Sequence, residues 1–404
     1  MHYTFPEIRH INDVLPAIEG RDEFVVAERE WGKVVNYLVV LPDTFPEVHT
    51  AGGSARMRAE ANRIKAIRRE CRGLLFYPDG RIMGRRLHKF FNVNERDETQ
   101  LGRIDLSRPH VILDKLDGSM ITPVYTDTGI RWGTKMGITT VSMQAEVHVA
   151  NNRAYTDMAE KCQQENQTAI FEWCSRSQRI VVDYPEDRLV LIAVRDNITG
   201  DYVSYDQLEA LGNYYKIPVV KTRAGTVANM ESLIDETRAS EGIEGYIIRF
   251  DNGQMLKIKG DWYVRIHKTK DNLALEKNVV DLLITEKMDD AKSFMLDDDR
   301  RRVEDFEHKF WQGLAQRVQH YDDYWQRVVS SGVDRKGFAV GWMPQIRDTD
   351  PFAAQFVFGK FGGRDSREMI VEQIAKNTGT GPRIDSVRAL WGGHSWNYHW
   401  NGDN

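Results

Sequence analysis

The chain of 404 residues is long enough for two domains, each with its own buried core. Hydrophobic residues make up 41% of the sequence and charged residues 28%, which is ordinary for a soluble globular protein. The net charge of −5 excludes a uniformly basic nucleic-acid coat, but it does not exclude local basic patches.

Cysteine usage and the N-terminal sequence indicate the cellular compartment. Cys71, Cys162 and Cys174 form no CxxC pair, which argues against a disulfide framework or a zinc ribbon. The first residues lack the basic and apolar regions of a signal peptide, and no apolar run approaches the roughly 18 residues of a membrane span. We therefore expect a cytoplasmic protein with no membrane partner. The absence of a Walker A loop and of GxGxxG disfavours the commonest phosphate-binding folds.

The N-terminal part of the chain combines short strands with one basic helix. Strand-like runs cover residues 23–27, 33–40 and 72–77, and the last is followed by the turn Pro78-Asp79-Gly80. Ser54 is positioned to cap a helix that carries several basic residues, namely Arg56, Arg58, Arg63, Lys65, Arg68 and Arg69. This helix could contact the phosphates of a nucleic acid, or it could be a solvated surface helix.

The central part, to about residue 260, is predicted to be mostly antiparallel strands. Strand candidates are residues 109–113, 120–125, 130–134, 169–174, 189–195, 245–250 and 255–258. Two helices are expected between them, over residues 141–166 and 205–215. This pattern is typical of an α+β arrangement rather than of alternating βα units.

Beyond about residue 270 the periodicity is helical. Helices are expected over residues 275–284, 290–294, 303–329 and 367–376. We therefore predict two domains, residues 1–270 and residues 271–404. The aromatic tail from Trp391 to Asn404 shows no structural pattern, and its side chains could stack bases, cover an apolar groove or be disordered.

The stretch Asp114-Lys115-Leu116-Asp117-Gly118-Ser119 is the first chemical candidate. A lysine at the end of a strand can act as a nucleophile beside a nucleotide pocket if its pKa is lowered by burial or by neighbouring cations. Such a short motif also occurs in ordinary surface turns, so it needs partners elsewhere in the chain.

Four further stretches supply candidate partners. Glu172 and Glu244 lie at strand ends, Arg72 begins a strand, and Lys257 and Lys259 alternate and so share one strand face. Taken singly, each has a structural explanation as a solvated strand end or an exposed edge. Together they occur in the order and approximate spacing of the covalent nucleotidyltransferase superfamily.

The resemblance is closest to the tRNA-repairing RNA ligases of T-even bacteriophages, and it covers about residues 30 to 290. The stretches that carry it are Glu70-Cys71-Arg72-Gly73, Lys89-Phe90-Phe91-Asn92, Lys115-Leu116-Asp117-Gly118-Ser119, Phe171-Glu172, Arg179-Ile180-Val181, Thr199-Gly200-Asp201-Tyr202, Glu244-Gly245-Tyr246 and Lys257-Ile258-Lys259 with the following Gly260-Asp261-Trp262-Tyr263-Val264. The resemblance implies an antiparallel-rich, ATP-grasp-like nucleotidyltransferase domain for adenylylation, followed by an all-helical C-terminal domain for RNA or tRNA specificity.

The resemblance also implies the roles of individual residues. Lys115 would take AMP from ATP as a lysyl-AMP, and Lys257, Lys259 and Arg72 would offset phosphate charge and lower the pKa of Lys115. Asp117 would position the lysine and the adenylate, and Glu172 would bind the ribose hydroxyls. Glu244 would order a metal through water, and Lys89 would bind the triphosphate. Tyr37 would lie near the adenine, and Lys135 would take part in RNA sealing. Asp289, next to Asp290, matches a metal-binding region, although this acidic pair could equally be a solvated helix start.

The expected activity is that of an ATP-dependent RNA ligase using Mg²⁺ or Mn²⁺. It would join the 5′-phosphate and 3′-hydroxyl ends of single-stranded RNA, in particular broken tRNA, as a monomer in the cytoplasm or, if phage-encoded, the host cytoplasm. A DNA ligase or a GTP-using capping enzyme would share the nucleophile and both glutamates. A non-catalytic RNA-binding module is the remaining alternative.

Overall fold

The computed structural model describes residues 4–49, 53–223 and 229–398, and its contacts divide them into two compact units. The first unit ends at Val264 and the second begins at Arg265. Helix α7 (Asp261–Leu273) spans this division. The sequence pattern predicts the change from strands to helices near residue 270.

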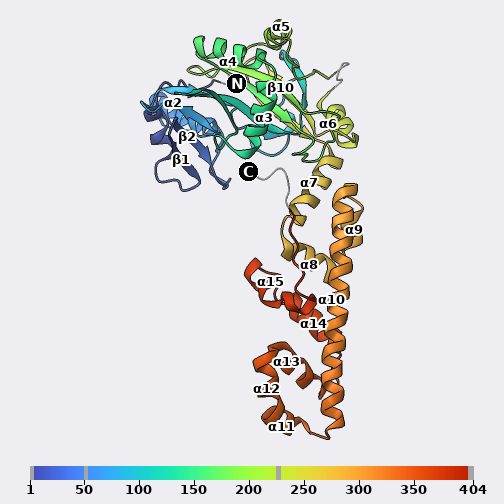
Figure 1. The fold of residues 1–404 in the computed structure, drawn as a ribbon. Helices are drawn as coiled ribbons and strands as arrows, with labels where there is room; N and C mark the ends of the chain where they lie inside the picture. The colour runs from blue at the N-terminus through green and yellow to red at the C-terminus, as the bar shows by residue number, and fades with distance from the viewer. Residues whose placement is uncertain (1–3, 50–52, 224–228, 399–404) are drawn as a thin grey trace. The chain divides into compact units, whose positions relative to one another are not determined.

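Three four-stranded sheets form the first unit (Figure 1). The first has the order β1-β2-β3-β4, with β1 (Phe24–Arg29), β2 (Gly32–Tyr37), β3 (Leu74–Phe76) and β4 (Ile82–Gly84). The second has the order β10-β9-β7-β8, with β7 (Ser119–Thr126), β8 (Gly129–Gly133), β9 (Gln167–Cys174) and β10 (Arg188–Asp196). The third has the order β5-β12-β11-β6, with β5 (Phe91–Asn92), β6 (His110–Lys115), β11 (Gly245–Phe250) and β12 (Met255–Lys259).

Neighbouring strands of these sheets pair antiparallel, except for the parallel pair β12 and β5. Helices of the first unit are α1 (Leu15–Ile18), α2 (Ala55–Glu70), α3 (Thr140–Ala150), α4 (Ala154–Gln164), α5 (Tyr205–Tyr215) and α6 (Met230–Ala239). Ser54 caps α2 as predicted, because its hydroxyl accepts a hydrogen bond from the backbone N–H of Met57.

The sequence-based elements of the first unit need three corrections. The single helix expected over residues 141–166 is two helices, α3 and α4, because the chain turns at Asn151 and Asn152, residues that favour helix ends. Strand β2 ends at Tyr37 rather than at Val40, and the apolar side chains from Leu38 to Leu41 are exposed. Helix α6 was not predicted.

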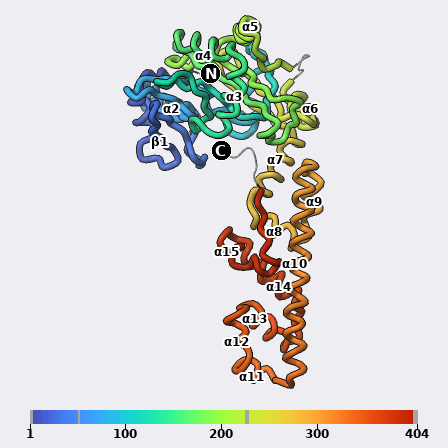
Figure 2. Tube along the Cα trace, in the orientation of Figure 1, coloured from blue at the N-terminus to red at the C-terminus, as the bar shows by residue number. Residues whose placement is uncertain are grey.

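The described residues of the second unit form helices joined by turns, with no strand among them, and end in an extended segment after Trp391. Its helices are α8 (Glu276–Ile284), α9 (Met288–Lys292), α10 (Asp297–Ser330), α11 (Arg335–Gly337), a π-helical turn (Phe338–Trp342), α12 (Met343–Thr349), α13 (Pro351–Lys360), α14 (Ser366–Ala375), α15 (Gly381–Val387) and a 3₁₀ turn (Arg388–Trp391). Helices α13 and α14 pack along the long helix α10 (Figures 1 and 2). The α+β class with a helical C-terminal region is thus confirmed.

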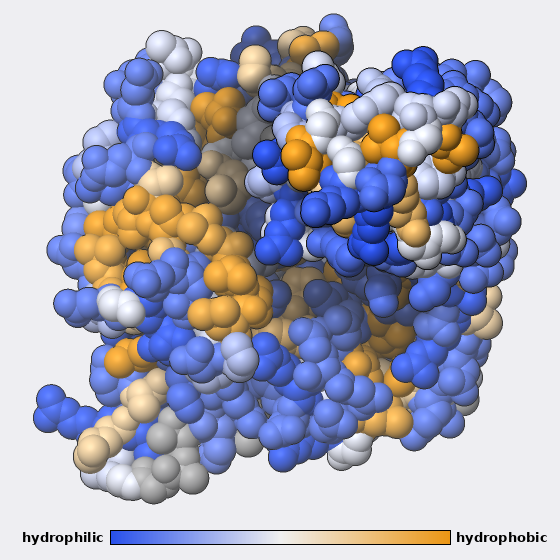
Figure 3. Space-filling view, turned by 90° about the horizontal axis from the view of Figure 1, so that it is seen from below, coloured by the Kyte–Doolittle hydropathy of each residue, from blue (hydrophilic) through white to orange (hydrophobic). Residues whose placement is uncertain are grey.

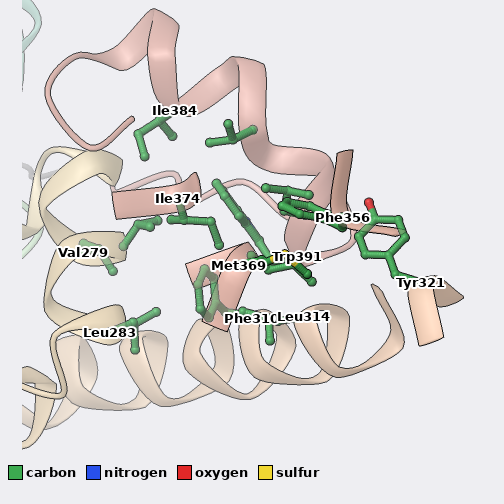
Figure 4. Close-up of a cluster of buried hydrophobic side chains, with 14 of the residues drawn as sticks. Val279, Leu283, Phe310, Leu314, Tyr321, Phe356, Met369, Ile374, Ile384 and Trp391 are labelled. Carbon is green, nitrogen blue, oxygen red and sulfur yellow. The ribbon is translucent and has the colours of Figure 1, made fainter. Parts of the chain in front are cut away.

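The aromatic tail contributes to the core of this second unit. Trp391 is fully buried, and its ring lies 5.3 Å from that of Phe310 (Figure 4). Trp396 is also buried, and its indole N–H donates to the carbonyl of Leu273. These residues therefore cover an apolar groove rather than stack bases, whereas Trp400 lies outside the described residues.

The face drawn in Figure 3 is mostly hydrophilic, with separate apolar patches. Among the described residues, no helix is long and apolar enough to cross a membrane. All three cysteines are buried and unpaired.

Candidate active site

Strand register brings Lys115 and the paired lysines into one row of the third sheet. Gly245 in the middle strand β11 pairs with Lys115 of β6 on one side and with Lys259 of β12 on the other. Lys257 lies two residues before Lys259 and therefore projects from the same face. The sheet thus brings Lys115 beside two lysines that lie more than 140 residues later in the sequence (257 − 115).

Glu244 joins two of these amines. Its Oε1 lies 2.7 Å from Nζ of Lys115 and 3.1 Å from Nζ of Lys259, and the side chain is buried. Burial raises the pKa of Glu244, but Lys115 and Lys259 outweigh burial, and the net pKa is lowered. Glu244 is therefore a carboxylate.

The same contacts determine the protonation of Lys115. Burial lowers its pKa, but the carboxylates of Glu244 and Glu172 outweigh burial, so the pKa is raised above that of an ordinary lysine. The net shift is therefore opposite to the lowered pKa that the resemblance implied for Lys115. An ion pair with Glu244 was not visible from sequence spacing.

Two glycines allow the strands of the site to approach closely. A Cβ on Gly118 would lie 2.4 Å from the carbonyl oxygen of Trp173, and a Cβ on Gly245 would lie 2.0 Å from that of Ile258. Real Cβ contacts are never this short, so only glycine fits. This close approach explains the glycine in both short motifs, because each motif holds its charged residue against a neighbouring strand.

Glu172 lies on β9, opposite Met120 of β7. Burial raises its pKa to about 8, an effect that Glu244 increases and that Lys115 and Arg72 only partly offset. At neutral pH this carboxyl group is therefore mostly protonated, and it can donate as well as accept a hydrogen bond.

Asp117 anchors the loop that follows Lys115. Its Oδ2 accepts hydrogen bonds from the backbone N–H groups of Val181 and Val182, both at 2.7 Å. Its Oδ1 accepts one from the hydroxyl of Tyr263, also at 2.7 Å. With its oxygens satisfied in this way, Asp117 fixes the position of Lys115 rather than facing a ligand.

Four predicted residues form a second group near Lys115. The ammonium groups of Lys89 and Lys135 lie 5.4 and 5.0 Å from the ring centre of Tyr37. Burial raises the pKa of Tyr37, but Arg72, Lys89 and Lys135 outweigh it, and the net pKa is lowered. Tyr37 thus lies among three cations.

Both groups line one cavity of about 350 Å³. Its walls include eight of the predicted residues, namely Tyr37, Arg72, Lys89, Lys115, Lys135, Glu172, Lys257 and Lys259. Apolar side chains, among them Met120, Ile192 and Ile247, complete the lining. The cavity can hold a flat apolar group together with a polyanion.

The pKa of Lys257 reflects the excess of positive charge in this cavity. Burial, followed by the charges of Lys115, Lys89 and Lys259, lowers its pKa to about 7. An anion bound beside Lys257 would reverse this effect. The cavity is therefore suited to phosphate groups.

The two predicted metal ligands belong to different units, Glu244 to the first and Asp289 to the second. Within the described part of the chain, no group of three or more His, Cys, Asp or Glu residues is placed to hold a metal ion. Asp289 belongs to the second unit, where its exposed carboxylate pairs with Lys292 at 3.2 Å. Glu244 is available only as one ligand, which fits a metal carried largely by phosphate oxygens and water.

Sequence reasoning missed Arg86 as a residue that supports the site. Its buried guanidinium donates to the carbonyl of Gly73, next to Arg72, and at 3.2 Å to that of Gly133, two residues before Lys135. It also missed Tyr184, whose hydroxyl oxygen accepts a hydrogen bond from the backbone N–H of Asp117. Neither residue lies in a stretch that looked chemical.

Comparison with known proteins points to one family for the region that contains this cavity. Residues 70–263 match the RNA ligase family. This RNA-ligase region includes Lys115, both glutamates and the paired lysines, but it excludes Tyr37 and the second unit.

Two curated proteins are similar to part of the chain. A putative RNA ligase of Thermovibrio ammonificans is 29% identical over 265 residues, which cover 64% of this chain and 63% of that protein. RNA ligase 1 of bacteriophage TS2126 is 25% identical over 211 residues, which cover 49% of this chain and 51% of that protein. The match thus spans less than two thirds of the length of either relative.

Among solved structures, an archaeal ATP-dependent RNA ligase matches this chain with 15% sequence identity and a TM-score of 0.42. The match covers 64% of this chain and 64% of the ligase chain.

Proposed function

We propose that this protein is an ATP-dependent RNA ligase that joins a 5′-phosphate end to a 3′-hydroxyl end through lysyl-AMP and RNA-adenylate intermediates. The observation that carries the proposal is the position of Lys115, which lines a cationic cavity beside Glu244, Lys257 and Lys259. The match of residues 70–263 to the RNA ligase family supports the same reaction class.

In the first step, Nζ of Lys115 attacks the α-phosphorus of ATP. A phosphorus–nitrogen bond forms, the bond to the β-phosphate oxygen breaks, and pyrophosphate leaves. Lys115 must lose a proton, and Glu244 Oε1 is the carboxylate within hydrogen-bond distance of its amine. Phosphate charge near Lys257 and Lys259 is stabilised by both amines in the transition state.

Other residues of the cavity bind the nucleotide. The protonated carboxyl group of Glu172 can donate to one ribose hydroxyl and accept from another. Arg72 and Lys89 bind the triphosphate. Because Tyr37 lies among three cations, we assign it to the phosphate end of the nucleotide rather than to the adenine.

A divalent cation, Mg²⁺ or Mn²⁺, would be held by phosphate oxygens and water, with Glu244 as the carboxylate that orders this water. When bound, such an ion neutralises phosphate charge. Asp289 remains a proposed ligand from the second unit.

In the later steps AMP passes to the RNA 5′-phosphate, and the 3′-hydroxyl then displaces AMP, with Lys135 contacting the RNA. A broken tRNA is the proposed substrate, and the helical second unit is the proposed reader of its shape through phosphate contacts. We propose that the protein acts as a monomer in the cytoplasm.

Covalent labelling tests the central step. Lys115→Ala and Lys115→Arg are expected to abolish transfer of label from [α-³²P]ATP to the protein, because neither side chain offers a free amine. Lys161→Ala changes an exposed lysine that pairs with Glu165 and should label normally. Retention of the label in Lys115→Ala would contradict the assignment of the nucleophile.

The substrate is tested by sealing assays. Single-stranded RNA and a tRNA cleaved in its anticodon loop should be sealed with ATP, and a nicked DNA duplex should not. A preference for GTP, or for the nicked duplex, would instead indicate a capping enzyme or a DNA ligase.

A further inference from the structure

The cavity of about 350 Å³ that Lys115 lines is the proposed nucleotide cavity. A second cavity, of about 580 Å³, lies beside it in the first unit. Its lining comes from several segments: the loop at Glu47–His49, the end of α2, the segment around Phe91, the turns at residues 98–103, and Met255 with its neighbours. None of the steps above uses this space. We name this second cavity the donor cavity.

The two cavities share a wall. Lys89, Phe90 and Met255 line both of them. The ammonium of Lys89 lies 5.4 Å from the ring centre of Tyr37, in the nucleotide cavity, and 5.6 Å from that of Phe91, in the donor cavity. A phosphate group bound to Lys89 would therefore lie at the boundary between the cavities.

A second amine of the nucleotide cavity also lies near this wall. Nζ of Lys257 is 5.8 Å from the ring centre of Phe90. A chain of phosphates running past Lys257 to Lys89 would thus begin in the nucleotide cavity and end at the donor cavity.

The donor cavity combines apolar rings with arginines. Phe5, Phe90 and Phe91 supply ring surface, and Arg69, Arg103 and Arg108 supply guanidinium groups. Arg69 is 4% exposed and pairs with Glu98 at 2.6 Å, yet its buried Nε has no hydrogen-bond partner among the described residues. Rings with nearby guanidinium groups are the combination that binds nucleobases and phosphates.

We propose that the donor cavity holds the 5′-terminal nucleoside of the RNA strand whose 5′-phosphate receives the adenylate. The inference rests on the proposed function. The RNA phosphate oxygen attacks the phosphorus of lysyl-AMP, the phosphorus–nitrogen bond breaks and a phosphorus–oxygen–phosphorus bridge forms. The leaving amine of Lys115 takes a proton back from the carboxyl group of Glu244. The bridge then lies near Lys257 and Lys89, with adenosine on one side and the RNA nucleoside on the other.

A third cavity is a weaker candidate for the same nucleoside. It measures about 200 Å³, also borders Lys257 and Lys259, and contains Arg238. No aromatic side chain lines it, so it offers no ring surface to a base. Arg238 therefore provides a matched control.

The test separates the two chemical steps. Val48→Trp fills the donor cavity, and Arg103→Ala removes a largely exposed guanidinium from it. Both variants should form lysyl-AMP at a rate within about twofold of the wild-type rate, because neither residue lines the nucleotide cavity. Transfer of AMP from the isolated lysyl-AMP protein to a 5′-phosphorylated oligoribonucleotide should be slower by about tenfold, equivalent to about 1.4 kcal/mol.

Arg238→Ala should transfer AMP normally. A photoreactive base at the first position of the oligonucleotide should crosslink to peptides containing residues 47–49 or 98–108. Normal transfer in both donor-cavity variants would overturn the inference, as would slow transfer in Arg238→Ala alone. Slow lysyl-AMP formation in Arg103→Ala would assign the cavity to the triphosphate instead, and absence of lysyl-AMP in the wild-type protein would refute the proposed function itself.

Discussion

At the residue scale, adjacent buried arginines serve two different structures. Arg85 pairs with Glu70 at 3.0 Å in a buried network that includes Arg195. Arg86 instead donates to the backbone carbonyls of Gly73 and Gly133, which lie close in the chain to Arg72 and Lys135. Burial and the charge of Arg72 lower the pKa of Arg86 to about 9. We infer that Arg86 positions the phosphate-binding residues.

Replacing each of the two arginines by methionine should therefore have a different effect. Arg86→Met should raise the KM for ATP in lysyl-AMP formation by about tenfold, because Arg72 and Lys135 lose their fixed positions. Arg85→Met should lower the free energy of unfolding by about 3 kcal/mol while the folded fraction keeps its KM. Urea unfolding and initial-rate kinetics measure the two quantities, and equal changes in KM would show that Arg86 is only structural.

The residue types of the site could be predicted, but their protonation states could not. Lys115, Glu172, Lys257 and Lys259 line one cavity, although up to 144 positions separate them in the sequence (259 − 115). The pKa of Lys115 has the opposite shift from the predicted one because it depends on the contact with Glu244. Similarly, Asp117 binds backbone N–H groups, which no sequence motif reveals.

At the scale of elements, helix α2 separates into an exposed part and an anchored part. Arg56, Arg58 and Arg63 are exposed, whereas Arg68 donates to the carbonyl of Ala17 and Arg69 is buried. The last turn of this helix thus stabilises the fold, whereas its earlier turns present exposed positive charge.

The exposed part permits a salt-dependence prediction. If α2 contacts RNA phosphates, Arg56→Ala with Arg63→Ala should reduce the slope of log binding constant against log salt by about 1.4, at about 0.7 per contact for a single strand. Arg153→Ala with Lys161→Ala removes the same charge from exposed positions elsewhere and should leave the slope unchanged. If both pairs change the slope equally, α2 is a solvated helix without a specific RNA contact.

Sequence predicted some helix boundaries but not others. The Ser54 cap and α5 follow from local chemistry, and both are present. The break between α3 and α4, by contrast, interrupts a continuous helical pattern, and α6 lies in a stretch whose apolar face is recognisable only from its packing on β11 and β12.

At the scale of the whole molecule, the tail completes the second unit. The backbone of Trp391 passes so close to α10 that a Cβ on Gly313 would lie 2.3 Å from its carbonyl oxygen. The sequence around Trp391 shows no structural pattern, because the residue that Trp391 packs against, Phe310 on α10, lies 81 positions earlier in the chain (391 − 310).

The contribution of Trp391 to stability can be measured. Trp391→Ala should destabilise the second unit by about 3–5 kcal/mol, because it leaves a large cavity beside Phe310. Limited proteolysis should then cleave within residues 265–398 first, while lysyl-AMP formation by the first unit continues. Val340→Ala alters a side chain that is 74% exposed and should leave the cleavage pattern unchanged. Loss of lysyl-AMP formation in Trp391→Ala would mean that the first unit depends on the second.

The ion pair between Lys115 and Glu244 has a consequence for the chemical durability of the protein. Cells contain electrophiles such as cyanate and aldehydes that modify neutral amines and spare protonated ones. An amine held as an ammonium ion by a buried carboxylate, as Lys115 is by Glu244, is sheltered from such damage. The carboxylate that pairs with Lys115 thereby preserves it.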